Sequence, residues 1–150
     1  MAKELRGLLY AASVDVETID ALASLGVASY AESIGYHAQQ AAEKLVKSVF
    51  EKNNEAFPFT HNISSLLNRA NDLGFLDFDD ETLEQASYLS SLISLTRYAD
   101  APDFQEGEAL DAMRAFEAIS RMISDNGYES LALSPCKDEP KEGQSVRESL

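Results

Sequence analysis

Disulfide bonds within the chain are excluded, because its sequence contains one cysteine, Cys136. The only two histidines, His37 and His61, stand far from this cysteine and lack the short spacing of zinc ligands. We therefore expect a reducing compartment. The sequence predicts neither a bound metal nor any other cofactor.

Long apolar runs are missing as well. A membrane-spanning helix needs about 20 consecutive apolar residues, and no stretch of this sequence approaches that length. The charged residues 1–6 are followed by no long apolar core, so a conventional signal peptide is not expected. We expect a protein of the cytoplasm that has no membrane partner.

Basic residues are scarce. The chain has 12 Lys and Arg against 26 Asp and Glu, which gives a formal net charge of -14, and residues 76–127 alone hold 12 acids and 3 bases. Proteins that follow a nucleic-acid backbone present a basic stripe that neutralises phosphates, and this sequence has none. Binding of extended nucleic acid is therefore not expected, whereas solubility and a basic partner protein are favoured.

Proline and glycine number only 4 and 7, and most of them stand between segments whose apolar residues recur at three- and four-residue intervals. This spacing is helical, and no strand pattern competes with it. A length of 150 residues with 45% hydrophobic content suits one domain, and short connections place neighbouring helices antiparallel. The sequence predicts an all-α, up-and-down antiparallel bundle of four to five helices. The helices are expected at residues 3–24, 29–53, 79–96 and 108–124, with a short third helix that begins at Thr60 or Asn62 and is closed after residue 73 by Gly74.

The bundle is expected to occupy residues 1–127. Beyond it, residues 128–150 are rich in Ser, Pro, Lys and Glu and contain few large apolar side chains. Burial of so little apolar surface cannot offset the entropy that is lost on ordering. We therefore expect residues 128–150 to form a disordered acidic tail.

The segment 29–53 has a regular inward side and a charged outward side. Glu43, Lys47 and Glu51 are expected to form an outward ladder of four-residue charge pairs. In the segment before it, Asp15 lies among weak helix formers and can cap a restart of the helix. The apolar stripe of that segment is predicted to consist of Leu5, Leu8, Leu9, Ala12, Val16, Ile19 and Ala23. The inward side is predicted to consist of Ile34, Ala38, Ala41, Leu45 and Val49.

The segment 79–96 carries apolar residues on more than one face. A helix of this kind lies at the centre of a bundle or is shared with a second subunit, so a symmetric homodimer is expected to cover the surplus surface. The residues concerned are Tyr88, Leu92 and Leu95 on one stripe, Leu89 and Ile93 on another, and Tyr36 and Phe50 on the charged side of the segment 29–53.

Three short motifs carry a family resemblance. The first is His-Ala-Gln-Gln-Ala-Ala-Glu-Lys at residues 37–44, the second is Thr60-His61, and the third is Leu-Thr-Arg-Tyr-Ala-Asp at residues 95–100. The chain resembles the HEPN domains (higher eukaryotes and prokaryotes nucleotide-binding), in which these motifs occur in the same order. Here Ala99 replaces the proline of the family's Arg-Tyr-Pro segment. The resemblance covers about residues 15–125, and the first motif is its most specific part.

The catalytic motif of the HEPN ribonucleases is absent. Many of these enzymes carry an arginine that is followed, after four to six intervening residues, by a histidine. No arginine of this chain has a histidine at that spacing; Arg97, for example, is followed there by Pro102, Asp103 and Phe104. Glycine-rich phosphate loops, Gly-x-Ser-x-Gly and His-Glu-x-x-His are also absent. No catalytic residue is therefore predicted.

The sequence still allows a binding site, because His37, His61 and Arg97 fall in or near three different predicted helices. Their side chains can therefore converge in the folded bundle. In one interpretation these side chains, with Gln40 and Lys44, hold a phosphate or a nucleotide through charge and imidazole hydrogen bonds. In the other, which we favour, each histidine satisfies a neighbouring carboxylate or backbone group. Arg97, near a predicted helix end, then complements the helix dipole.

Two functional hypotheses follow. The leading one is a non-catalytic, HEPN-like binding or accessory module that forms a homodimer. The resemblance implies this partnership, because HEPN proteins commonly associate in pairs and often work beside a minimal nucleotidyltransferase in a toxin-antitoxin-like system. The alternative is a nucleotide-binding protein or weak ribonuclease that uses His37, His61 and Arg97.

Overall fold

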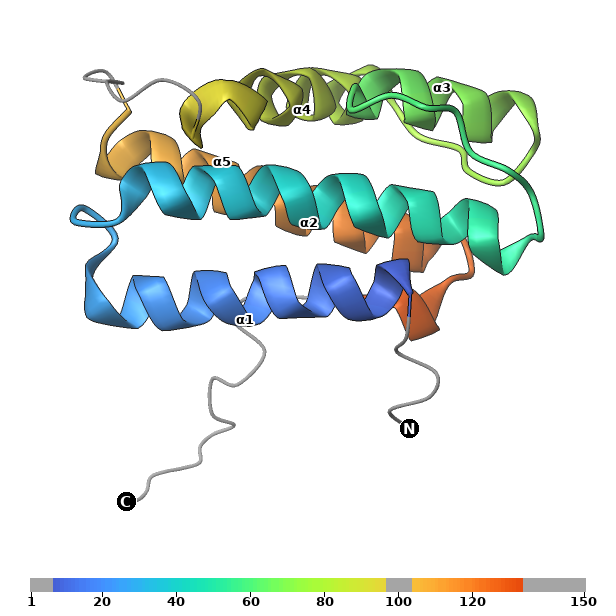
Figure 1. The fold of residues 1–150 in the computed structure, drawn as a ribbon. Helices are drawn as coiled ribbons and strands as arrows, with labels where there is room; N and C mark the ends of the chain where they lie inside the picture. The colour runs from blue at the N-terminus through green and yellow to red at the C-terminus, as the bar shows by residue number, and fades with distance from the viewer. Residues whose placement is uncertain (1–6, 97–103, 134–150) are drawn as a thin grey trace.

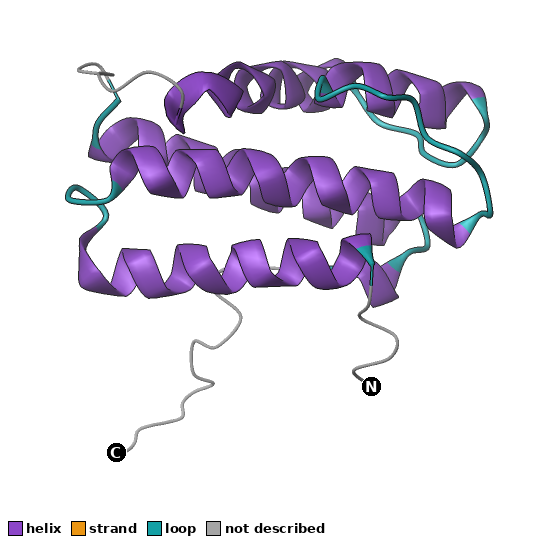
Figure 2. Ribbon diagram, in the orientation of Figure 1, coloured by secondary structure: helices purple, strands orange, loops and turns teal. Residues whose placement is uncertain are grey.

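The computed structural model describes residues 7–96 and 104–133, and all regular structure within them is helical (Figure 2). The predicted all-α class is confirmed. None of the described helices has both the length and the apolar character that crossing a bilayer requires. In chain order the elements are α1 (Leu8–Gly26), α2 (Ala31–Lys52), α3 (Ile63–Asp72), α4 (Asp80–Ser90), the 3-10 helix η2 (Ser91–Thr96), α5 (Glu106–Asp125) and the 3-10 turn η3 (Glu129–Leu131).

Helix α2 is the centre of the bundle. Figure 1 shows α2 between α1 on one side and α3 with α4 on the other, while α5 lies behind it, and α2 packs against all four. Helix α1, in contrast, packs mainly against α2. Helices α1 and α2 are antiparallel, as are α4 and α5 (Figure 1). The predicted helical bundle is confirmed.

One connection departs from a simple up-and-down order. Residues 53–62 fold back along α2, so that α3 begins beside the middle of α2 and runs in the same direction (Figure 1). The contacts agree with this course. His61, just before α3, hydrogen bonds to Glu43, whereas Phe75, just after α3, contacts Phe50 near the end of α2. The returning loop therefore carries His61 to the middle of the central helix.

The inward side of α2 is the predicted one. Ile34, Ala38, Ala41, Leu45 and Val49 are all fully buried. Their three- and four-residue spacing places them on one face of the helix, and the two alanines let the neighbouring helices approach closely. Tight packing around α2 therefore follows directly from the sequence pattern.

Helix α1 is continuous through Asp15, so the expected restart of the helix at this residue is wrong. Of the predicted apolar stripe, Leu8 and Ala23 are half-buried and Leu5 lies outside the described residues. The buried members are Leu9, Ala12, Val16 and Ile19. Asp15 lies among them in the middle of the helix and is only 6% exposed. Contacts with α2 outweigh the weak local helix propensity here, since propensity is readily overridden by tertiary packing.

Helices α3 and α4 begin at side-chain caps. Asn62 Oδ1 accepts a hydrogen bond from the backbone N–H of Ser65 at 3.0 Å, and Asp79 Oδ1 accepts one from Thr82 at 3.1 Å, as helix starts require. Hydrogen bonds from the backbone and hydroxyl of Thr82 hold the pKa of Asp79 below its ordinary value. Gly74, with a φ of 81°, follows α3 in the left-handed region and forms the predicted stop.

The fourth predicted helix changes character near its end. The α-helix stops at Ser90, and η2 continues as a tighter 3-10 helix. Serine hydroxyls compete for backbone groups at this junction: Ser91 Oγ donates to the carbonyl of Tyr88, while Ser90 Oγ accepts from the backbone N–H of Ile63. The continuous α-helix predicted for residues 79–96 is therefore wrong in its last six residues.

The apolar surfaces that suggested a dimer are mostly covered within the single chain. Leu89 and Leu92 are buried in the bundle, and the half-buried Tyr88 donates its hydroxyl to the backbone carbonyl of Glu108. Burial, followed by nearby acidic charge, raises the pKa of this tyrosine. Phe50, expected on the charged side of α2, is fully buried instead. The side chain of Leu95 lies outside the described residues.

The packed structure continues past residue 127. Gly127, with a φ of 98°, turns the chain after α5, and η3 then places Leu131 in the core. Ser120 Oγ of α5 donates to the carbonyl of Leu133 and accepts from its N–H. The rest of the expected tail, residues 134–150, lies outside the described residues.

Candidate functional site

Asp15, His37 and Lys44 form a cluster between α1 and α2, which we call the Asp15 cluster. His37 Nδ1 lies 2.8 Å from Asp15 Oδ1, and Lys44 Nζ donates to Asp15 Oδ2 over 2.8 Å. The side chain of Asp15 is 9% exposed, whereas those of His37 and Lys44 are each 27% exposed. Both oxygens of a nearly buried carboxylate are therefore occupied by partners from the facing helix.

The chemistry of the carboxylate fixes the direction of these bonds. An ionised carboxylate only accepts hydrogen bonds, so His37 Nδ1 must carry the proton. Burial of an unpaired carboxylate costs several kcal/mol, and a close cation with a second hydrogen bond offsets that cost. Lys44 supplies the charge and His37 the additional hydrogen bond. The ring of Tyr36 contacts His37 edge-on, with centroids 5.4 Å apart, which further restricts the imidazole.

Glu43, Gln39, Lys47 and His61 form a second cluster, which we call the Glu43 cluster. Lys47 Nζ donates to Glu43 Oε2 over 2.8 Å, and Gln39 Nε2 donates to Oε1 over 2.9 Å. His61 Nδ1, from the returning loop, lies 3.0 Å from Oε2. The side chain of Glu43 is only 7% exposed. The predicted outward ladder is therefore wrong for Glu43, which faces inward between α2 and the loop.

Opposing effects set the pKa of Glu43. Burial raises it, but hydrogen bonds from Lys47, Gln39 and His61, together with the charge of Lys47, outweigh burial and hold the pKa below its ordinary value. The ionised form is thus the stable one in the folded protein. Both clusters share one design, in which a nearly buried carboxylate holds one lysine and the Nδ1 atom of one histidine.

The described residues among the five predicted for a ligand site divide between the two carboxylates. His37 and Lys44 bind Asp15. Gln40 lies beside the Glu43 cluster, since its Nε2 donates to Gln39 Oε1 over 2.7 Å. His61 binds Glu43, and Arg97 lies outside the described residues.

Asp15 and Glu43, which organise both clusters, were missed as site residues by the sequence analysis. Glu43 stands within the most specific motif, at residues 37–44, and that position was its only signal. Asp15 is 22 residues before His37, and nothing in the sequence joins the two. An acid on the apolar stripe of a predicted helix is nevertheless a usable signal, because an unpaired buried carboxylate is rare.

Few groups in the two clusters are available to bind a ligand or to transfer a proton. In each, the lysine charge is neutralised by a carboxylate, and the imidazole has one nitrogen engaged, which leaves Nε2. His61 is the more accessible, since its side chain is 69% exposed. Among the described residues, no group of three or more His, Cys, Asp and Glu side chains is placed to hold a metal ion.

A separate cleft of about 480 Å³ lies between α1, α5 and the chain after η3. Its lining includes Ser13 and Glu17 of α1, Ser120 and Arg121 of α5, and Leu133. No residue of either cluster lines it. The cavity and the clustered polar groups are thus different features of the molecule.

Replacement of Glu43 by glutamine tests the second cluster. A carboxyl whose folded pKa is lowered stabilises the fold above its unfolded pKa, and this stabilisation is lost as pH falls through the folded pKa. We expect Glu43→Gln to lower the free energy of unfolding at pH 7 by about 1.5–3 kcal/mol, the range for hydrogen bonds to charged groups. The difference from wild type should shrink as pH falls below 4.5, the ordinary value.

Urea denaturation at a series of pH values measures this effect. Glu51→Gln is the matched control, since Glu51 is an exposed acid on the same helix. Equal pH profiles for the two variants would contradict the role assigned to Glu43.

Comparison with known proteins adds one finding. A family model described as the HEPN domain matches residues 5–126, which include both clusters. No curated protein and no solved structure matches the chain. The HEPN match extends over more than half of the sequence, and it agrees with the helical bundle and with a module of the nucleotide-binding or ribonuclease-like class. The chain therefore belongs to the HEPN domain family.

Proposed function

We propose that this protein is a non-catalytic HEPN module that acts as a dimeric accessory subunit, paired with a minimal nucleotidyltransferase in a toxin-antitoxin-like system in the cytoplasm. One observation carries the non-catalytic part: each histidine is held by a different, nearly buried carboxylate that is also bound by a lysine. Both imidazoles thus have Nδ1 engaged by a carboxylate that holds the fold, and the side chain of His37 is also largely enclosed.

Charge argues in the same direction. The charges of Lys44 and Lys47 are already neutralised by Asp15 and Glu43. An approaching phosphate would therefore gain little net attraction and would compete with a nearly buried carboxylate for its cation. Loss of one partner from a buried pair is strongly unfavourable. The absence of the arginine-to-histidine spacing of the HEPN ribonucleases gives independent support to the same proposal.

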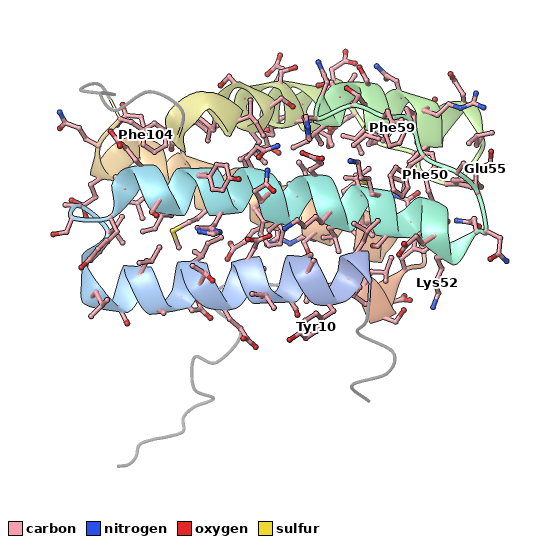
Figure 3. All side chains as sticks on the ribbon, in the orientation of Figure 1. Tyr10, Phe50, Lys52, Glu55, Phe59 and Phe104 are labelled. Atoms are coloured by element: carbon pink, nitrogen blue, oxygen red, sulfur yellow. The ribbon has the colours of Figure 1, made fainter. Side chains whose placement is uncertain are left out.

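The surface that supports a dimer is the outer side of α1. Tyr10, Val14 and Leu25 are 53%, 41% and 69% exposed, and their helical spacing places them on one face. Tyr10 lies on the outer edge of α1 in Figure 3. Because α1 packs mainly against α2, this face has no partner within the described part of the chain. A second copy would bury it symmetrically.

The nucleotidyltransferase partnership is proposed from family membership and from charge. The formal net charge of -14 favours a partner with a basic surface. If the neighbouring gene encodes a minimal nucleotidyltransferase, co-expression should yield a stable complex of the two purified proteins. A nucleotidyltransferase that elutes separately at micromolar concentration would argue against the pairing.

Val14→Glu tests the dimer. The added charge would be buried next to its symmetric copy, so we expect the variant to sediment as a monomer under conditions in which the wild-type protein is a dimer. Asn68→Glu is the control, because it adds the same charge at an exposed position of α3 and should leave the dimer intact. If the wild-type protein is a monomer, or if the Val14→Glu variant is still a dimer, the proposal that α1 forms the dimer interface is wrong.

An RNA-cleavage assay tests the non-catalytic assignment. We expect no cleavage of a single-stranded RNA above buffer background by the wild-type protein, with or without divalent cations. Cleavage that His61→Ala or Arg97→Ala abolishes, while both variants remain folded by circular dichroism, would replace this proposal with the ribonuclease alternative.

The second candidate function is nucleotide binding, with His37, His61 and Arg97 as the original candidates. One observation favours it: Glu43 fixes Nδ1 of His61, and the side chain is 69% exposed. Its Nε2 is therefore presented in a defined orientation. A ligand at this position would add to the accessory function without requiring catalysis.

A further inference from the structure

Phe59, in the loop that leads to α3, is an aromatic ring with no cover. It is 101% exposed, and Figure 3 shows it on the loop between α2 and α3, on the side of the bundle away from Tyr10. Its neighbour Phe57 behaves in the opposite way, since it packs edge-on against Phe50 with ring centroids 6.5 Å apart. Phe57 is therefore packed into the bundle, whereas the ring of Phe59 is exposed to solvent.

The loop is anchored on both sides of Phe59. Before it, Phe57 is packed into the bundle, and Lys47 Nζ lies 5.1 Å from the centre of its ring. After it, His61 is bound to Glu43. Lys47 also binds Glu43, so both anchors belong to the Glu43 cluster or touch it. Phe59 is therefore presented on a braced loop.

Phe59 and His61 are close enough to contact one small molecule. One residue separates them, so their Cα atoms lie at most about 7 Å apart, which is comparable to the length of a nucleoside. A fully exposed aromatic ring offers a face for stacking, which suits any nucleobase. His61, whose Nδ1 donates to Glu43, presents Nε2 as an acceptor while the ring is neutral, and that acceptor suits a ribose hydroxyl.

The charge distribution favours this end of the molecule for a nucleotide. Residues 37–71 hold four bases, three acids and both histidines, whereas residues 76–127 hold 12 acids and 3 bases. Phosphate groups are repelled by the acidic part. The α2 and α3 region is the least repulsive part of the described chain for an anionic ligand.

We propose that Phe59 and His61 form a nucleoside-binding platform, in which the base stacks on the ring of Phe59 and a ribose hydroxyl donates to His61 Nε2. The platform rests on the second candidate function, nucleotide binding, and gives it a location. The phosphate of a bound nucleotide extends into solvent, so base and ribose supply the recognition.

A single-tryptophan variant tests the platform. The chain contains no tryptophan, so Phe59→Trp introduces the only one and keeps an aromatic face. AMP should quench its fluorescence saturably, whereas ribose 5-phosphate, which has no base, should not. Tyr10→Trp, on the outer side of α1, is the matched control and should not respond. Quenching of both variants alike, or of neither, would overturn the platform.

Calorimetric titration of AMP separates the platform from nucleotide binding in general. Phe59→Ala, which removes a fully exposed ring and should leave the melting temperature unchanged, is expected to weaken AMP binding about 5- to 150-fold, the range for one stacked base. His61→Ala should weaken it as well. Equal AMP affinity in wild type and Phe59→Ala would overturn the platform while nucleotide binding stands.

No AMP binding by the wild-type protein would overturn both the platform and nucleotide binding. Loss of the dimer or of the nucleotidyltransferase complex in Phe59→Ala, without an effect of AMP, would instead identify the ring as a protein contact and also overturn the platform. The accessory function is judged separately, by complex formation.

Discussion

The burial of two carboxylates, Asp15 and Glu43, is the constraint on which the rest of the structure depends. Each would cost several kcal/mol if it were left unpaired, and each is therefore matched by a lysine and by Nδ1 of a histidine. Because His37 and Lys44 reach Asp15 from another helix, and His61 reaches Glu43 from the loop, these bonds also set the architecture. The Asp15 cluster ties α1 to α2, and the Glu43 cluster ties the returning loop to α2. Burial of apolar side chains along α2 supplies most of the folding stability. The two carboxylates determine which polar side chains of neighbouring elements lie opposite each other.

The same constraint limits what the protein does chemically. His37 and Lys44 are tied to Asp15 and are mostly enclosed, so they contribute to the α1 contact more than to any surface site. His61 differs, because the carboxylate fixes its orientation and leaves most of the side chain in solvent. A HEPN bundle of this type is suited to binding. Within the described residues, the groups that it offers to solvent include the oriented imidazole of His61, the ring of Phe59 and an apolar stripe on α1.

The fold was largely predictable from the sequence, because it depends on short-range spacing. The buried stripe of α2, the caps at Asn62 and Asp79 and the stop at Gly74 all follow from local rules. The site was less predictable, because Asp15 and His37 meet only through the packing of α1 on α2. The four-residue spacing of Glu43 and Lys47 also predicts a pair on the solvent side of the helix. The spacing cannot show that a loop folds back and buries this pair. The motif at residues 37–44 located the right helix without revealing which of its groups are partners.

Nitrogen-15 NMR of the two imidazoles tests the pairing of both carboxylates. At a pH where the rings are neutral, the proton of His37 and of His61 should reside on Nδ1, with Nε2 unprotonated, because an ionised carboxylate only accepts hydrogen bonds. Asp15→Asn should then change the signals of His37 alone, and Glu43→Gln those of His61 alone. Imidazoles protonated on Nε2, or a mixture of tautomers unaffected by either substitution, would contradict the proposed organisation of the bundle.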